Sequence, residues 1–341
     1  MRGLNFLALP DDRKVRLQIG EHGRATFIRH NMLVLPQSAT DAIHRNAATL
    51  WYPHPPSDAA SEPDWIVNNC TDPDTFAGAL QWLEETFPAH IPVFNSARAV
   101  AAATRDNQAA RFGAIPGLTV PQAHRFRFET EDDLRRVFED NAFTFPVLVR
   151  PVEFQAGVGM QRIDSHDDWA SLLYSRWYRK DHVMIQFIDT KTADDVYLKV
   201  RVTFIGGKPY IRHCKAASHW LVQGQQNDVI VARPEYELEL IDALEAHEGF
   251  MGICRQIGEI SDLDFFGADM GFDLASDRFV LFEANPSMSM FFPERVGREE
   301  LYFIRRKRLQ IPAEEHLNDY IGKPAEWRNM RSGQSAAGSA V

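Results

Sequence analysis

One segment in the last third of the chain constrains the fold most strongly, because it predicts a β-hairpin that carries acidic side chains. Two apolar stretches, Phe265–Asp273 and Phe279–Pro286, flank the turn-prone residues 275–278. A three-residue loop within this turn would place Asp269 directly opposite Glu283 on the neighbouring strand. The sequence therefore predicts two facing carboxylates in an otherwise apolar hairpin.

Asn285 adds a third oxygen donor to this pair. Because the side chains of a strand alternate between its two faces, Asn285 falls on the same face as Glu283. With Asp269 they make a set of two carboxylates and one amide oxygen, which suits Mg²⁺ held jointly by protein and phosphate oxygens. A hairpin with a purely structural role is the alternative, but such hairpins rarely bury Asp, Glu and Asn together.

Length and charge exclude several classes of protein. The chain has 341 residues, enough for two or three domains, and its net charge of −10 argues against a nucleic-acid partner. No apolar stretch approaches the roughly 18 residues of a membrane helix, and the N-terminus carries no signal-peptide pattern. We therefore expect a cytoplasmic protein with no membrane partner. The three cysteines, Cys70, Cys214 and Cys254, are far apart in the sequence, so we expect them to be free thiols.

The first part of the chain predicts a small α/β domain. Residues 64–69 and 91–95 are typical of buried strands, and a helix is expected after each of them. The first helix would open at Asp72, and the second would span 98–111. Strands that alternate with helices favour a parallel sheet, which we therefore expect before residue 118.

After residue 118 the pattern changes to short strands with fewer helices. A hairpin is predicted over 196–216 and a long helical region over about 238–258. Further strands are expected at residues 126–128, 145–150, 157–163 and 183–188. Helices are expected at 131–140 and 167–174. The small, polar residues 331–341 are typical of a disordered tail.

Two features in the middle of the chain could bind phosphate. Arg150 ends an apolar strand, where its cation can reach phosphate oxygens. The loop after it contains Gln155, Gly157 and Gly159, and glycines allow the positive φ with which backbone N–H groups cover phosphates. Two glycines separated by one residue are common, so a plain turn is the favoured interpretation of this loop on its own.

The strand expected at 183–188 ends in Gln186, Phe187 and Ile188. If this strand links two small sheets, its backbone could bond the edge of an adenine ring while Phe187 or Ile188 contacts the ring. A core strand is the simpler interpretation of the stretch taken alone.

Four basic or ionisable side chains alternate with apolar ones on the hairpin over 196–216. Lys199 and Arg201 share one face of its first strand. His213 and Lys215 share one face of its second strand. Such a face suits an anionic substrate or a phosphoryl group in transfer, although a solvated sheet face is an equally good interpretation.

The order of these features resembles that of an ATP-grasp enzyme over roughly residues 120–286. The stretch Phe282–Pro286 is similar to the Glu-x-Asn metal motif of that family, and Asp269 to its upstream metal-ligating aspartate. Residues 186–188 are similar to its adenine-binding linker. Arg201 is placed like the strand arginine that contacts phosphate and the acyl-phosphate intermediate.

Within that superfamily the chain resembles glutathione synthetase and the ribosomal-protein glutamate ligases, and more specifically a group sometimes linked to tetratricopeptide repeats. The pattern shared with that group comprises Arg105-Asp106, Ile115 to Gly117, Arg150-Pro151, Lys199 to Arg201, His213 to Trp220 and Phe282 to Met288. There are two departures. Many ATP-grasp enzymes have lysine where this chain has Arg150, and the group tends to have histidine in place of Gln155.

The resemblance implies two α+β subdomains that clamp ATP, at residues 119–188 and 189–295. An α/β domain at 1–118 would precede them, and a C-terminal helix and disordered tail at 296–341 would follow. The implied activity is that of an ATP-dependent carboxylate–amine or carboxylate–thiol ligase that forms an acyl phosphate and releases ADP and phosphate. Its substrate would be a peptide, an amino acid or a small biosynthetic carboxylate.

The resemblance also implies a role for each candidate residue. Mg²⁺ would be held by Asp269, Glu283 and Asn285; ATP would be bound by Arg150, Gln155, Gly157, Gly159, Gln186, Phe187 and Ile188; and catalysis would involve Lys199, Arg201, His213 and Lys215. Two other functions stay open, namely a small-molecule kinase of the same fold and a non-catalytic nucleotide-binding module. The sequence also leaves a homodimer open.

Overall fold

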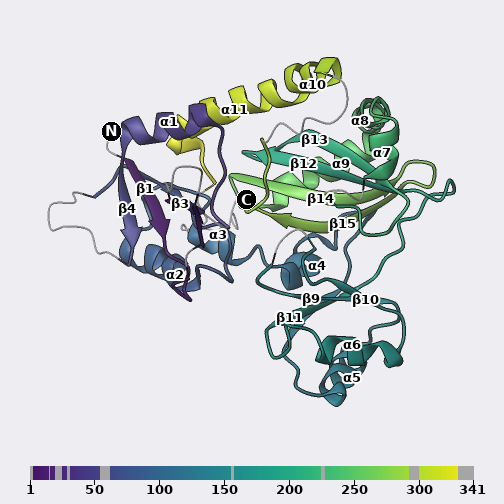
Figure 1. Ribbon diagram of the computed structural model, residues 1–341. Helices are drawn as coiled ribbons and strands as arrows, with labels where there is room; N and C mark the ends of the chain where they lie inside the picture. The colour runs from purple at the N-terminus through teal and green to yellow at the C-terminus, as the bar shows by residue number, and fades with distance from the viewer. Residues whose placement is uncertain are drawn as a thin grey trace, which may run out of the picture.

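The computed structural model describes residues 3–14, 16–19, 25–28, 31–53, 62–154, 157–223, 227–291 and 299–328. Three sheets of four or five strands make up most of this structure, and a two-stranded hairpin, β2 (Arg16–Ile19) with β3 (Ala25–Ile28), adds a fourth. Figure 1 shows the N-terminal sheet on the left, the five-stranded sheet on the right and the remaining sheet below. The tail predicted at 331–341 lies outside the described residues.

The N-terminal sheet is parallel, as the alternation of strands and helices predicts. Its strand order is β4-β1-β5-β6, and every neighbouring pair runs parallel. Helix α1 packs against β1 and β4, while α2 and α3 pack against each other. The elements are β1 (Gly3–Ala8), α1 (Gln37–Asn46), β4 (Ala47–Tyr52), β5 (Trp65–Asn68), α2 (Ala77–Thr86), β6 (Val93–Phe94) and α3 (Ala97–Ala101). Strand β5 is buried at every residue, as expected of an inner strand of a parallel sheet.

The five-stranded sheet contains both predicted hairpins, which are confirmed. Its order is β13-β12-β14-β15-β7, antiparallel except for the last pair. Helices α7, α8 and α9 pack against β13. The elements are β7 (Leu118–Thr119), β12 (Tyr197–Ile205), β13 (Lys208–Ala217), α7 (Asp228–Ala232), α8 (Tyr236–Ala246), α9 (Glu248–Ile260), β14 (Phe265–Asp273) and β15 (Arg278–Asn285). With its helices on one face, the sheet is left to present its polar side chains on the other.

The third sheet is antiparallel in the order β10-β9-β11-β8. Its elements are β8 (Ala123–Phe126), α5 (Glu131–Asp140), β9 (Val147–Pro151), β10 (Gln161–Ile163), η3 (His166–Asp168), α6 (Trp169–Leu173) and β11 (His182–Gln186). Phe126, Phe138 and Trp169 lie in its buried core. Strand β10 is shorter than the predicted 157–163, because the chain turns at the glycines that precede it.

One of the predicted helices is wrong, because it is broken in the structure. The helix expected over 98–111 is divided into α3, η2 (Arg105–Asn107) and α4 (Gln108–Phe112). Thr104 between them is extended, with φ −75° and ψ 154°. The helical region expected over about 238–258 is confirmed as two consecutive helices, α8 and α9. They are separated at His247, whose ring accepts the backbone N–H of Phe250 and so caps α9.

The C-terminal helices extend from beside α1 of the N-terminal part to above the five-stranded sheet (Figure 1). They are α10 (Glu299–Arg305), the π-helix η4 (Arg306–Gln310), α11 (Ile311–Ile321) and η5 (Pro324–Glu326). Helix α11 contacts both α1 and β12. The three cysteines are free, as predicted, and all three are buried. In the described ranges, no helix has the length and apolar character that a membrane span requires.

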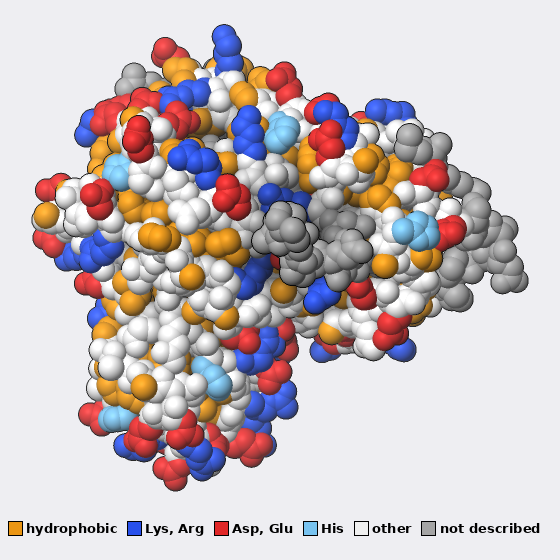
Figure 2. All heavy atoms as spheres, turned by 180° about the vertical axis from the view of Figure 1, so that it is seen from behind, with side chains coloured by type: hydrophobic (Ala, Val, Ile, Leu, Met, Phe, Trp, Pro, Cys, Tyr) orange, Lys and Arg blue, Asp and Glu red, His pale blue; other side chains and the backbone are white. Residues whose placement is uncertain are grey.

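The surface seen from behind mixes acidic and basic side chains (Figure 2). The interior instead holds a few polar groups that join distant segments, above all the carboxylate of Asp264, which is 0 % exposed. It accepts the backbone N–H groups of Asn95 and Arg328, each at 2.7 Å, and the Tyr320 hydroxyl at 2.8 Å. One buried carboxylate thus joins the N-terminal sheet, the five-stranded sheet and the C-terminal helices.

We expect Tyr320→Phe to destabilise the protein, and more strongly above pH 6 than at pH 4.5. Burial raises the pKa of Asp264 to about 6 from an ordinary value of 3.8, so the folded protein loses stability as pH rises between these values. Above pH 6 the buried carboxylate is charged and depends on its donors. Losing the Tyr320 hydroxyl should then cost about 1–3 kcal/mol.

Chemical denaturation at pH 4.5 and pH 8 measures the loss of folding stability of Tyr320→Phe at each pH. The exposed Tyr174, changed to Phe, is the matched control and should be neutral at both pH values. An equal loss for Tyr320→Phe at the two pH values would contradict the role given to the charged carboxylate.

Candidate active site

The two predicted carboxylates face each other across the β14–β15 hairpin. Asp269 pairs with Glu283 in the register of the sheet. The connecting loop has four residues, 274–277, rather than the predicted three, and a bulge at Phe282 restores the pairing. Phe282 and Glu283 consequently line the same pocket, although strict alternation would send them to opposite faces.

A row of charged side chains crosses four adjacent strands of this sheet. Arg201 on β12 lies between His213 on β13 and Asp269 on β14 in the register of the sheet. Glu283 on β15 completes the row beside Asp269. Partners in register point to the same side of a sheet, so basic and acidic groups meet on one face.

Two cations hold Asp269, which is only 7 % exposed. Its carboxylate accepts Nε and Nη2 of Arg201 at 2.7 and 2.9 Å, and Nζ of Lys199 at 3.2 Å. Burial by itself would raise the pKa of Asp269, but the charges of Arg201 and Lys199 outweigh it and hold the pKa well below its usual range. The Asp269 carboxylate is therefore ionised at neutral pH.

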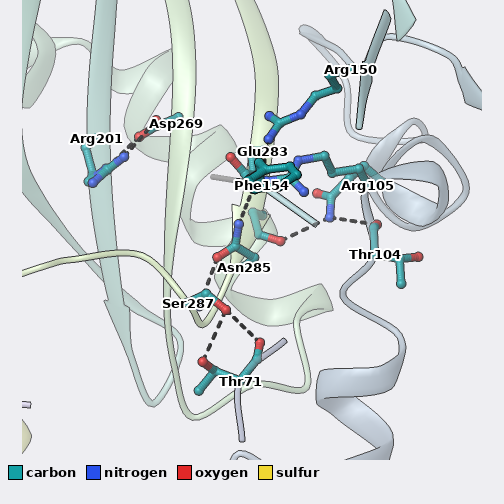
Figure 3. A network of polar contacts seen from close by, with 12 residues as sticks. Thr71, Thr104, Arg105, Arg150, Phe154, Arg201, Asp269, Glu283, Asn285 and Ser287 are labelled. Carbon is teal, nitrogen blue, oxygen red and sulfur yellow. Dashed lines mark hydrogen bonds and ion pairs between the residues drawn. The ribbon is translucent and has the colours of Figure 1, made fainter. Parts of the chain in front are cut away.

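Glu283 is connected to the N-terminal sheet by a chain of polar contacts (Figure 3). Its carboxylate pairs with Arg105 and accepts the Nδ2 group of Asn285. The Asn285 Oδ1 atom accepts the backbone N–H of Ser287 at 2.9 Å. The Ser287 hydroxyl donates to the carbonyl oxygen of Thr71 at 2.9 Å. The predicted donor Asn285 is thus next to Glu283, with its amide nitrogen turned toward the carboxylate.

Arg105 has no predicted role beyond the shared Arg105-Asp106 pattern, yet the structure places it at the centre of the site. It lies on η2, directly after the extended Thr104 that interrupts the predicted helix. In an unbroken helix its position relative to Glu283 would differ. Its partner is 178 positions away in the sequence, so no local pattern signals this contact.

A pocket opens between the five-stranded sheet and the β9–β11 strands, with about 870 Å³ of empty space, open solvent included. Its charged lining consists of Arg105, Arg150, Lys199, Asp269 and Glu283. Its apolar lining includes Leu148, Ile185, Phe187, Ile188, Tyr197 and Phe282. An apolar chamber with charged groups at one end suits a ligand that has a ring and an anionic tail.

Arg150 is the most deeply buried cation of this pocket, at 4 % exposure. Its Nη2 group donates to the carbonyl oxygen of Phe154, but its Nε atom has no partner among the described groups. Burial and the nearby charge of Arg105 lower the pKa of Arg150 to about 10, so it remains a cation at neutral pH. A buried cation with an unsatisfied donor fits a phosphate ligand.

The predicted adenine linker lies along the same pocket, which Gln186, Phe187 and Ile188 all line. The Gln186 side chain is already bonded locally, because it donates to the Thr144 carbonyl oxygen at 2.9 Å and accepts the Thr144 N–H at 3.1 Å. The Phe187 ring lies under the Arg162 guanidinium, 4.5 Å from the ring centroid. Gln186 therefore holds the linker in place, while Phe187 and Ile188 supply apolar surface.

The predicted glycine loop adopts the backbone conformation that glycine favours. Gly157 has φ +65° and Gly159 has φ +75°. A Cβ atom on Gly159 would lie 2.4 Å from the Trp177 indole, so this position has no room for a side chain. Neither glycine is among the described residues that line the pocket, and Gln155 lies outside the described residues.

His213, Lys215 and Arg201 are buried or partly buried in the sheet and do not line the pocket in the described structure. Lys215 lies beside Lys199 in register, in the row next to that of His213 and Arg201. Burial, together with the charge of Arg201, lowers the pKa of His213 well below its usual value. His213 is therefore neutral at pH 7 and contacts the site through its neighbours.

A second, smaller pocket lies on the other side of Glu283, with about 290 Å³ of empty space, open solvent included. Arg105 and Glu283 line both pockets. The remaining polar lining comes from the N-terminal part and the end of β15, namely Thr71, Asp72, Asp74, Thr104, Asn285 and Ser287. Arg105 and Glu283 therefore lie at the boundary between the larger pocket and a smaller polar one.

The predicted metal ligands fit a hard divalent cation. Within the described part of the chain, no three His, Cys, Asp or Glu side chains gather as a metal site, so the set is two carboxylates and one amide. Asp269 and Glu283 face each other in register, and each attracts a cationic side chain. An all-oxygen donor set beside a pocket that suits phosphate is typical of Mg²⁺.

Comparison with known proteins bears on the fold. No family model matches the chain. No curated protein matches it either. Among solved structures, a RiPP-associated ATP-grasp ligase from Chryseobacterium gregarium, in complex with ADP and a leader and core peptide, is 12 % identical with a TM-score of 0.51. The alignment covers 97 % of this chain and 99 % of that one.

Two further solved structures align with this chain at a TM-score of 0.49. They are a RimK domain protein ATP-grasp from Sphaerobacter thermophilus (13 % identity, 93 % and 99 % of the two chains) and D-alanine–D-alanine ligase from Bacillus anthracis (12 %, 95 % and 98 %). At these identities a likeness bears on the fold alone. The alignment with the Chryseobacterium protein spans almost the full length of both chains. The chain has the ATP-grasp fold.

Proposed function

We propose that the protein is an ATP-dependent carboxylate–amine ligase that works through an acyl phosphate. The observation that carries this proposal is the pair of pockets that share Glu283 and Arg105. One pocket suits a nucleotide and the other a small polar group, and the charged row of the sheet lies where they meet. A reaction that joins a phosphate donor to an acceptor needs this arrangement, because the two reactants must meet in line.

In this proposal ATP occupies the larger pocket. The ring would lie along Phe187 and Ile188, whose apolar surfaces line the chamber. The phosphates would point to Arg150 and Lys199, with the loop of Gly157 and Gly159 supplying backbone N–H groups. The same proposal divides the chain into domains at residues 118, 188 and 295. The nucleotide would lie between the domains 119–188 and 189–295.

Mg²⁺ would be held by Asp269, Glu283 and Asn285, where it would neutralise phosphate oxygens during transfer. To bind the ion, the Asn285 amide group would rotate. Its oxygen, rather than its nitrogen, would then point toward the Glu283 carboxylate. Arg201 would stay on Asp269 and stabilise the negative charge of the transferring group from beside the metal site. Lys215 would add positive charge from the adjacent row, through Lys199.

Two chemical steps follow. An oxygen of the acceptor carboxylate attacks the γ-phosphorus of ATP, the bond to the β-phosphate oxygen breaks, and ADP leaves. The nitrogen of the amine then attacks the acyl carbon, phosphate leaves, and the amine loses one proton. His213 is neutral at pH 7 and adjoins Arg201, so we propose that it orients Arg201 or receives this proton through a relay.

The direct test is to incubate the protein with Mg·ATP and pools of small carboxylates, amino acids, dipeptides and amines. The proposal predicts ADP and phosphate release together with a condensed product in the mass spectrum. A product that gains only a phosphoryl group would identify a kinase instead. Nucleotide binding without any turnover would favour a non-catalytic module.

Glu283→Gln should lower turnover by about 100-fold or more, because it removes one of the two carboxylates proposed to hold Mg²⁺. It should also abolish the gain in ADP affinity that Mg²⁺ gives, which calorimetry measures even before the acceptor is known. Glu259→Gln, at an exposed position of α9, is the matched control. Unchanged Mg²⁺ dependence in Glu283→Gln would refute the metal assignment.

Arg150→Met should weaken ADP binding by about 10- to 100-fold, because a charged hydrogen bond contributes roughly 1.5–3 kcal/mol. Methionine keeps much of the apolar volume of the buried stem. The exposed Arg135 on α5, changed to Met, is the control for a loss of positive charge alone. Equal affinities for the two variants would mean that Arg150 does not meet the phosphates.

A further inference from the structure

One of the two carboxylates proposed to hold a divalent cation is already bonded to cations of the protein. The Oδ2 atom of Asp269 accepts two donors, Nζ of Lys199 at 3.2 Å and Nη2 of Arg201 at 2.9 Å. Each carboxylate oxygen has two lone pairs, so Oδ2 has none left for a further ligand. The Oδ1 atom accepts Nε of Arg201 at 2.7 Å (Figure 3).

Lys199 is the partner of Asp269 that lies on the side of the larger pocket. Lys199 and Asp269 both line this pocket, whereas Arg201 does not line it in the described structure. The oxygen that Lys199 bonds is therefore the one that a ligand in the pocket can reach. A divalent cation on Oδ2 would lie within roughly 5 Å of the Lys199 ammonium, where the two positive charges repel each other. Lys199 and a divalent cation thus exclude each other on this oxygen.

Glu283 presents no such obstacle. Its contacts with Arg105 and Asn285 both fall on its Oε1 atom. Neither contact uses Oε2, so Glu283 can bind a cation through that oxygen while Arg105 keeps its contacts. Asp269, rather than Glu283, therefore limits the access of a divalent cation to the pair.

The position of Lys199 suits a second partner inside the pocket. A lysine ammonium has three N–H donors, and Asp269 uses one of them. Lys215 lies beside Lys199 in the register of β12 and β13, and like charges opposite each other are unfavourable. The buried Arg150 lines the same pocket and adds positive charge. An anionic group in the pocket would therefore attract Lys199 away from Asp269.

We infer that Lys199 takes the place of the divalent cation on Asp269 until nucleotide phosphates bind. A nucleotide would then bind without the cation, whereas the cation would bind well only together with a nucleotide. The inference rests on the proposed function and adds its order of binding. As the nucleotide binds, the Lys199 ammonium would turn to a phosphate oxygen and leave Oδ2 of Asp269 to the ion. Arg201 would keep its bonds to Asp269, so the carboxylate retains a cationic partner throughout.

Titration with Mn²⁺ in the absence of nucleotide, with the free ion counted by electron paramagnetic resonance, tests the first half of this exchange. Lys199→Met should bind Mn²⁺ about 10-fold more tightly than the wild type, because Oδ2 of Asp269 becomes accessible and one repelling charge is lost. Lys199→Gln, which keeps a polar group, is the second variant and should show the same gain. Lys208→Met, at an exposed position of β13, is the matched control and should bind as the wild type does. Equal or weaker Mn²⁺ binding in both Lys199 variants would overturn the inference.

Calorimetric titration with ADP in the presence of a chelator tests the second half. The wild type should bind ADP without a metal ion, and Lys199→Met should bind it about 10-fold more weakly, because a charged hydrogen bond to phosphate is lost. Lys199→Arg keeps the charge and should stay near the wild-type affinity. The same substitution, Lys199→Met, thus shifts the two affinities in opposite directions, whereas a purely structural role would weaken both. An unchanged affinity for ADP in Lys199→Met would mean that Lys199 does not move to the phosphates, which contradicts the exchange.

Failure of this inference differs from failure of the proposed function. If Mg²⁺ raises the affinity of the wild type for ADP but the Lys199 variants match the wild type in both titrations, the nucleotide and metal sites stand and the exchange on Asp269 is wrong. If the wild type binds neither ADP nor Mn²⁺, alone or together, the proposed function itself fails.

Discussion

The site depends on one constraint, which is that two carboxylates on neighbouring strands must be held close together inside the protein. Asp269 and Glu283 face each other in register, and their mutual repulsion in a buried setting is tolerable only because each has a cation. Arg201 and Lys199 serve Asp269, and Arg105 serves Glu283. The cations beside the two carboxylates follow from this need.

The three cations come from two parts of the fold, so the site also depends on how these parts are joined. Lys199 and Arg201 lie on the strand next to Asp269, which makes their contacts a direct result of sheet pairing. Arg105 comes from the N-terminal half, and its position depends on the contact between that half and the five-stranded sheet. Ser287 and Asp264 secure this contact at two separate points, through Thr71 and Asn95.

Much of the fold could be predicted because its sequence signals are local. The alternation of apolar residues gave both hairpins, and the pairing of Asp269 with Glu283 is correct. The alternation of apolar residues alone does not explain why this pairing is correct. The loop is one residue longer than expected, and the bulge at Phe282 compensates for the extra residue. A bulge depends on packing against the neighbouring strand and on the pocket, which a single strand's pattern does not record.

The parts that could not be predicted depend on distant contacts. Composition favours one alanine-rich helix over 98–111, but the extended Thr104 breaks it and brings Arg105 to a partner in β15. Some of the candidate residues line the pocket and others do not, and their spacing in the sequence does not show which. Lys199 lines the pocket, while His213, one row away on the same sheet, does not.

A crystal structure of the protein with ADP and Mg²⁺ would test the central claim most directly. The account predicts a metal ion held by Asp269 and Glu283 beside the diphosphate, with Arg150 on a phosphate oxygen. A nucleotide bound elsewhere, or one bound in the larger pocket with no metal ion on the two carboxylates, would contradict it.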